Sequence, residues 1–268
     1  ACRGTAGFAH VSCLAEQVKI LVAEAEENNW DNDRFMPRWG RWHSCSLCKQ
    51  QYHGVVRCAL GWACWKMYVG RPETNWARFS AMTVLANGLA AACCFEDAVS
   101  VEEANLSTRR RVGSSEIDLL VVESNLATTY KELGRFEEAL RLKRDVYSGH
   151  LKLSGKESEA TIKAAYNYAN SLLDLKRFEE GKSLLRENIP VARRVLGDSF
   201  DLTLAMMQNY AVALYGNTAA TLDDLREALT LLEEIERTTR RVFGGTHPRT
   251  VLTEDSLRIA RAALRARE

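Results

Sequence analysis

Residues 125–140 read N-L-A-T-T-Y-K-E-L-G-R-F-E-E-A-L, and residues 167–182 repeat this pattern as N-Y-A-N-S-L-L-D-L-K-R-F-E-E-G-K. The two stretches are shifted by 42 residues, and a third stretch, N-Y-A-V-A-L-Y at 209–215, follows at the same shift. After a short insertion the pattern resumes with D-L-R-E-A-L-T-L, and a weaker first copy begins near residue 80. Self-similarity at a fixed period of this length is typical of a repeat architecture.

Each unit of this repeat contains two segments with helical spacing. Leu126, Ala127 and Tyr130 fall on one helix face, and Ala139 follows them after a turn at residues 133–135. Small residues recur at matching positions, so the two helices of a unit can approach closely. The pairs are Ala127 with Ala139, Ala169 with Gly181, and Ala211 with Ala228.

Each unit also ends at a glycine, which suits a helix C-cap in the left-handed conformation. These glycines are Gly113, Gly155, Gly197 and Gly244. Helix–turn–helix units that stack in this way form a solenoid, and three or more of them are needed to bury a continuous core. The sequence therefore predicts a mostly α fold, in the form of a helical solenoid.

The pattern resembles the tetratricopeptide repeat (TPR), and its 42-residue period resembles the kinesin light chain variety, whose consensus contains N-L-A and G-R-Y-E-E-A. The resemblance covers residues 79–268, with about four units and a closing helix near 250–266. It implies that the first helix of each pair lines a concave groove that binds partner proteins or extended peptides. It also implies that Asn125, Asn167 and Asn209 face this groove. The alternative is that each asparagine bonds a neighbouring helix or a loop carbonyl.

A second group of residues has metal-ligand spacing near the N-terminus. Cys2, His10 and Cys13 are followed by Cys45 and Cys48, in the order Cys-x7-His-x2-Cys and Cys-x2-Cys. Zn²⁺ prefers thiolate and imidazole ligands in a tetrahedron, and Cys-x2-Cys lets one tight turn offer two sulfurs. The alternatives are a redox pair for the Cys-x2-Cys and an ordinary core histidine for His10.

This ligand order resembles the second half of a RING-CH (RINGv) finger, a zinc-binding module of ubiquitin ligases. The resemblance implies that residues 1–55 are the C-terminal part of such a finger. It further implies that the intact protein binds two Zn²⁺ ions and that the missing ligands precede Ala1. The resemblance implies that Leu14 and a tryptophan, Trp42 with Trp39 as the alternative, contact a ubiquitin-conjugating enzyme, and that the ligase needs no catalytic residue of its own. Two departures are the long insert ahead of Cys45 and the lack of a proline beside it.

Between the two modules, residues 56–78 are predicted to contain a connecting helix. Just ahead of that helix, Q-Y-H-G-V-V-R at 51–57 is predicted to form a short strand. Trp62, Trp65 and Tyr68 have the spacing of a core stripe on that helix. Four cysteines lack paired ligand spacing and are predicted to be small buried residues. They are Cys58, Cys64, Cys93 and Cys94.

Charge and hydropathy exclude several classes of function. A net charge of +1 creates no global field toward nucleic acid or an anionic membrane. We interpret the short clusters Arg109–Arg111, Arg193–Arg194 and Arg240–Arg241 as solvated helix faces, with phosphate binding as the alternative. No apolar run is long enough to span a bilayer, and no signal peptide is recognised. We expect a cytoplasmic protein, and leave open a targeting segment upstream.

No phosphate-loop, nucleophile-elbow or metalloprotease motif occurs in the sequence. The first functional hypothesis is a zinc-binding RING-CH-type ubiquitin ligase, whose TPR repeats bind substrate or partner proteins. The alternative is a non-enzymatic TPR interaction scaffold, in which the zinc module is purely structural.

Overall fold

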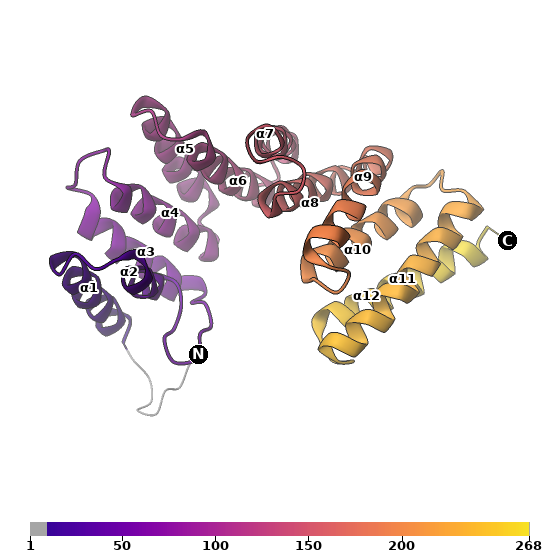
Figure 1. Ribbon diagram of the computed structural model, residues 1–268, viewed down its shortest axis with the longest axis horizontal. Coiled ribbons are helices and arrows are strands. Elements are labelled where there is room, and N and C mark those ends of the chain that lie inside the picture. Colours follow the sequence, from indigo (N-terminus) through magenta and orange to yellow (C-terminus); the bar gives the residue numbers. More distant parts are fainter. Residues whose placement is uncertain (1–9, 268) are drawn as a thin grey trace. The chain divides into compact units, whose positions relative to one another are not determined.

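The structure is a computed structural model that describes residues 10–267 (Figure 1). The chain divides into two compact units, an N-terminal unit (residues 1–135) and a C-terminal unit (residues 136–268). Cys2 lies outside the described residues. Within residues 10–267 every regular element is a helix, and the only β-type pairing is an isolated bridge between Ser44 and Gln51.

In the described part of the N-terminal unit, one short helix and a 3₁₀ turn lie among five helices of 15–17 residues. α1 packs against α2 and α3, and from α3 onward each helix packs against the next. The side chains of Trp42, Leu60 and Tyr68 are completely buried in the core that these elements share with α4. The helices are α1 (Val11–Glu27), α2 (Asn32–Trp39), the 3₁₀ turn η1 (Gly40–Trp42), α3 (Gly54–Tyr68), α4 (Trp76–Ala91), α5 (Phe95–Arg111) and α6 (Glu116–Glu132).

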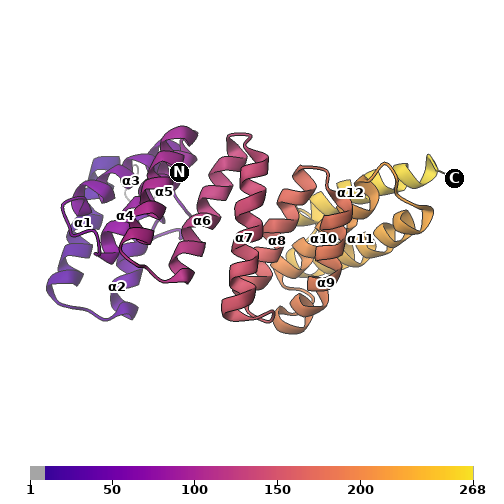
Figure 2. The ribbon, with the colours of Figure 1, turned by 90° about the horizontal axis from the view of Figure 1, so that it is seen from above.

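In the C-terminal unit, six helices follow one another as side-by-side neighbours (Figures 1 and 2). The first helices of successive pairs also touch, α8 on α10 and α10 on α12. Leu185, Met206 and Leu232 are fully buried in the core between them. The helices are α7 (Phe136–Ser154), α8 (Glu159–Asp174), α9 (Phe178–Leu196), α10 (Asp201–Gly216), α11 (Leu222–Phe243) and α12 (Pro248–Arg265).

The predicted helical repeat is confirmed. The small residues at the predicted helix contacts are buried, with Ala169, Ala211 and Ala228 at 0% exposure. The glycines at the unit ends all adopt a positive φ, as a chain that must leave a helix sharply requires. Their φ values are 73° at Gly113, 76° at Gly155, 96° at Gly197 and 89° at Gly244. Among the described helices, none combines the length and apolar character that a membrane crossing requires.

Three local predictions around α3 and α4 are wrong. The predicted strand at 51–57 does not form, because α3 begins at Gly54 and takes up its second half. Trp62 is 44% exposed, since it lies on the side of α3 that faces away from the core. Cys93 and Cys94 are exposed because they form the turn between α4 and α5 and lie in neither helix.

Helices α3 and α4 pack with their backbones unusually close together. A Cβ atom at Gly88 would lie 2.8 Å from the carbonyl oxygen of Arg57 and 3.0 Å from the Cα of Cys58. On the facing helix, a Cβ atom at Gly61 would lie 3.0 Å from the Cα of Leu85. Only glycine fits at these two positions unless the helices move apart. This contact fixes α4 against the N-terminal helices, and so places the site described next.

Candidate functional site

The predicted metal ligands of the first pair lie at the start of α1. His10 is the N-cap residue of this helix and Cys13 is in its first turn. Both side chains are exposed, and residues three apart lie on the same side of a helix. His10 and Cys13 therefore have the accessibility that metal ligands need.

The second predicted pair, Cys45 and Cys48, lies in one tight turn. The backbone N–H of Cys45 donates to the carbonyl of Gln50 at 2.8 Å, and that of Lys49 donates to the carbonyl of Cys45 at 3.0 Å. Lys49 has a φ of 60°, which closes the turn. Within residues 10–267, no three metal-ligating side chains are grouped so that they could hold an ion. The zinc sites therefore remain a prediction, although a turn of this kind suits paired thiolate ligands.

Of the two residues predicted to contact a conjugating enzyme, one packs against the core and the other lies inside it. Leu14 is partly buried against the cluster that contains Val18 and Val22. Trp42 has no exposed surface at all, because α1, α3 and α4 enclose it. A ring that is completely buried cannot contact a second protein, so the role predicted for Trp42 does not fit this structure.

The three predicted groove asparagines differ in their surroundings. Asn125 on α6 and Asn167 on α8 are half-buried, and neither side chain forms a hydrogen bond with a described residue. Asn209 on α10 donates to Oδ1 of Asn170 on α8 at 2.5 Å. Asn209 therefore matches the alternative, a bond to a neighbouring helix, whereas the other two retain free amide groups.

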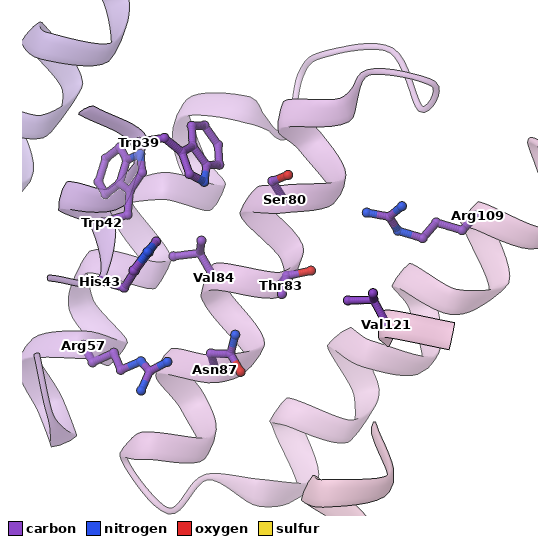
Figure 3. A pocket seen from close by; sticks show the side chains of 10 residues that line it. All are labelled: Trp39, Trp42, His43, Arg57, Ser80, Thr83, Val84, Asn87, Arg109 and Val121. Carbon is purple, nitrogen blue, oxygen red and sulfur yellow. The ribbon is translucent and has the colours of Figure 1, made fainter. Parts of the chain in front are cut away.

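The N-terminal unit contains a pocket of about 320 Å³ that the sequence did not indicate. Figure 3 shows that Ser80, Thr83 and Asn87 follow one another along α4, between Arg57 on one side and Arg109 on the other. Helices α2, α3 and α4, together with η1 and the turn after it, supply one wall, and α5 and α6 supply the opposite one. The lining residues are Trp39, Trp42, His43, Arg57, Ser80, Thr83, Val84, Asn87, Arg109 and Val121.

Arg57 contributes a half-buried positive charge without a carboxylate partner. Its guanidinium makes one long contact, 3.5 Å to Oε1 of Gln51, and no ion pair. Burial lowers the pKa of Arg57, and Arg57 in turn helps to lower the pKa of His43, for which burial is the larger cause. Because arginine keeps its proton at all physiological pH values, the pocket carries a partly desolvated cation.

Arg109 contributes the second positive charge, from α5. Its side chain is 13% exposed and stacks over the ring of Phe79, 4.4 Å from the ring centre. Nε donates to Oδ1 of Asn105 at 3.1 Å, and the nearest carboxylate is that of Asp118 at 3.8 Å. The interpretation of Arg109–Arg111 as a solvated face is therefore wrong for Arg109, and fits only its two neighbours, which are more than half exposed.

The remaining polar groups of the pocket are neutral. The side chains of Ser80 and Asn87 form no hydrogen bonds with described residues, so their donors are available. Thr83 donates to the carbonyl of Phe79 at 3.3 Å and accepts from Asn105 at 3.2 Å. The indole N–H of Trp42 is buried beside the pocket and has no partner. No aspartate or glutamate lines the pocket.

Comparison with known proteins agrees with the repeat architecture. Residues 124–159 match the family model of the tetratricopeptide repeat. Among curated protein sequences, none matches the chain significantly. Solved structures of similar fold include a Podosopora anserina kinesin light chain-type protein with nearly identical TPR-like repeats. It is 16% identical to this chain, and the two structures superpose with a TM-score of 0.59. The match covers 87% of this chain and 98% of that one.

Two further structures share the fold. BtubC from P. vanneervenii is 15% identical, with a TM-score of 0.57 over 97% of this chain and 90% of its own. A Rap protein complexed with competence and sporulation factor is 11% identical, with a TM-score of 0.55 over 95% of this chain and 66% of its own. The chain thus has a TPR-like solenoid fold. It contains tetratricopeptide repeats, and its structural neighbours include proteins of the kinesin light chain type.

Proposed function

We propose that this protein is a TPR-type interaction scaffold, whose first helices present polar side chains to extended segments of partner proteins. The observation that supports this function is the recurrence of a half-buried, unbonded amide at the same position of successive pairs, Asn125 on α6 and Asn167 on α8. A partly buried amide that makes no internal hydrogen bond is available to the backbone of a bound peptide. The Rap structure shows a chain of this fold in complex with another factor.

The two unbonded asparagines should matter for binding, and Asn209 should matter for stability. We expect Asn125→Ala and Asn167→Ala each to weaken peptide binding by about 2- to 10-fold, the loss of one hydrogen bond. We expect Asn209→Ala to lower the melting temperature, because it leaves Asn170 without its partner. The probe is a peptide selected from a random phage-displayed library, and affinity is measured by fluorescence polarisation.

Asn32→Ala, at the exposed start of α2, is the matched control for these variants. Its affinity and melting temperature should equal those of the wild type. If Asn125→Ala and Asn167→Ala bind the selected peptide as tightly as the control does, the two amides have no role in recognition. The interaction surface would then lie elsewhere on the repeats.

The second candidate is the zinc-binding ubiquitin ligase, with a cytoplasmic location and a conjugating enzyme as partner. Its support is the ligand order of Cys2, His10, Cys13, Cys45 and Cys48 and the tight turn that holds the last two. These donors fit zinc, which would supply the cross-link that folds the module. The burial of Trp42 removes one of the two contacts expected with the enzyme, so we place the scaffold first.

Zinc stoichiometry tests the metal assignment. A chain extended upstream by the remaining ligands should bind two Zn²⁺ ions, whereas residues 1–268 should bind one weakly or none, because two tetrahedral sites need eight ligands. Cys45→Ser and Cys48→Ser should each remove an ion from the extended chain, and Cys93→Ser, an exposed cysteine in another turn, should remove none. Elemental analysis measures the content. Two firmly bound ions in residues 1–268 would contradict the assignment.

A further inference from the structure

We propose that the pocket between α3, α4 and α5 binds the phosphate group of a phosphorylated serine or threonine on an extended peptide. This inference rests on the proposed function, because it names the chemistry of a partner that the first repeat would recognise. It depends on four features of the pocket: its position, its charge, its free donors and its size.

The position of the pocket matches that of the predicted groove. Leu85-Ala86 in α4 corresponds to Leu126-Ala127 in α6, so Val84 occupies the place that Asn125 has in the next repeat. Val84 lines the pocket, together with Val121, which lies one helical turn before Asn125. A peptide that follows the first-helix faces of the N-terminal unit would therefore pass over this opening.

The charge of the pocket favours a dianion. Arg57 has no carboxylate partner, and Arg109 has only the distant and largely exposed Asp118. Two guanidinium groups face a lining without any acid. A phosphate monoester carries close to two negative charges at neutral pH, whereas an aspartate or glutamate side chain carries one. Two partly buried arginines therefore match a phosphate better than a carboxylate, and their planar forks suit its oxygens.

The neutral donors lie between the two arginines. The amide of Asn87 and the hydroxyl of Ser80 are unbonded and come from the same face of α4 (Figure 3). A phosphate group offers three acceptor oxygens, so it can use both guanidiniums and one or two neutral donors together. The volume of about 320 Å³ is at the lower end of small-ligand pockets and holds one modified side chain.

The test compares three fluorescent peptide libraries that differ only at one fixed central position, which is phosphoserine, serine or glutamate. The full chain should retain the phosphoserine library at least tenfold better than the serine library. The glutamate library should be retained only slightly better than the serine library, because glutamate carries one negative charge and phosphoserine close to two. Arg57→Gln and Asn87→Asp should each reduce phosphoserine binding by about tenfold, through loss of a charged hydrogen bond or introduction of a repelling charge. Arg110→Gln is the control, since Arg110 is exposed and pairs with Glu123.

Asn87→Asp is nearly isosteric, so we expect it to keep the fold. An Arg109 variant would also lose the stacking of Arg109 on Phe79 and is therefore not used as a test. Equal retention of all three libraries, or unchanged phosphoserine binding in both pocket variants, would overturn the proposal. If peptides then still bind in a way that Asn125→Ala weakens, the interaction scaffold stands and only the phosphate pocket fails. Direct binding of inorganic phosphate, measured by calorimetry, without any retention of the phosphoserine library would show that the pocket takes free phosphate, which also overturns the peptide assignment.

Discussion

Replacing Gly88 by alanine is expected to destabilise the N-terminal unit by about 1–3 kcal/mol, and replacing it by leucine to unfold much of that unit. The atoms that the new Cβ would meet are the carbonyl oxygen of Arg57 and the Cα of Cys58, at 2.8 Å and 3.0 Å. Both are backbone atoms of α3, so they cannot rotate away. The two helices would have to separate, and the core around Leu60 would open with them.

The sign of the alanine effect is what makes this test decisive. Alanine is favoured over glycine inside an exposed helix by about 1 kcal/mol, so a helix position without the close contact would gain stability. Gly40→Ala is the matched control: its backbone is helical and a Cβ there would meet nothing within 4 Å. Tryptophan fluorescence follows the N-terminal unit specifically, because all six tryptophans lie in it. If Gly88→Ala proves as stable as Gly40→Ala, the close approach of α3 and α4 is wrong.

The repeat could be predicted from sequence because each of its determinants is local. The Asn125-Leu126-Ala127 step and its copy at Asn167 recur within a single helix and its turn, and the glycine that ends each unit follows from the conformation that the chain needs there. Such signals do not depend on which distant segments meet. This is why the helices, their order and the buried small residues were found without a structure.

The pocket could not be predicted in the same way, because its walls come from distant segments. Arg57 and Arg109 are far apart in sequence, and nothing near either residue shows that they face one space. Arg109 is the one member of a basic cluster that points inward, and the positions of Asn105 and Leu106, one turn earlier and both buried, are a weak signal of this. Gly61 and Gly88 inside helical patterns are a signal of the close contact between α3 and α4, since glycine is unfavourable inside a helix unless packing requires it.

In the N-terminal helices, a family resemblance led to a wrong prediction. It implied that Trp42 is exposed, whereas the structure buries this residue completely. Trp42 was expected on a surface because of its place ahead of the Cys45 and Cys48 pair. In the structure a short 3₁₀ turn carries it into the core, where it belongs to the same buried cluster as Leu60 and Tyr68. Whether a large aromatic residue is a surface contact or a core residue depends on the direction of its helix, which spacing alone does not give.

Replacing Trp42 by alanine is therefore expected to lower the free energy of unfolding of the N-terminal unit by about 3–5 kcal/mol, the usual cost of emptying a buried aromatic site. Trp62→Ala on the neighbouring α3, where the ring is 44% exposed, should change it by less than about 1 kcal/mol. Trp42→Phe should fall between the two, because it keeps most of the ring and removes an indole N–H that has no partner. Urea titration followed by the fluorescence of the remaining tryptophans measures all three.

The same three variants separate the two roles that this tryptophan has been given. A ring on a contact surface can be removed at little cost to folding, so Trp42→Ala and Trp62→Ala would then be equally stable and only binding to a second protein would change. A ring in the core cannot be removed without a cavity, whose cost rises with the volume left empty. Equal stability of the two alanine variants would place Trp42 on the surface and restore the enzyme contact. A large loss of stability confined to Trp42→Ala would show that Trp42 has a structural role. Any loss of binding in that variant would then reflect unfolding.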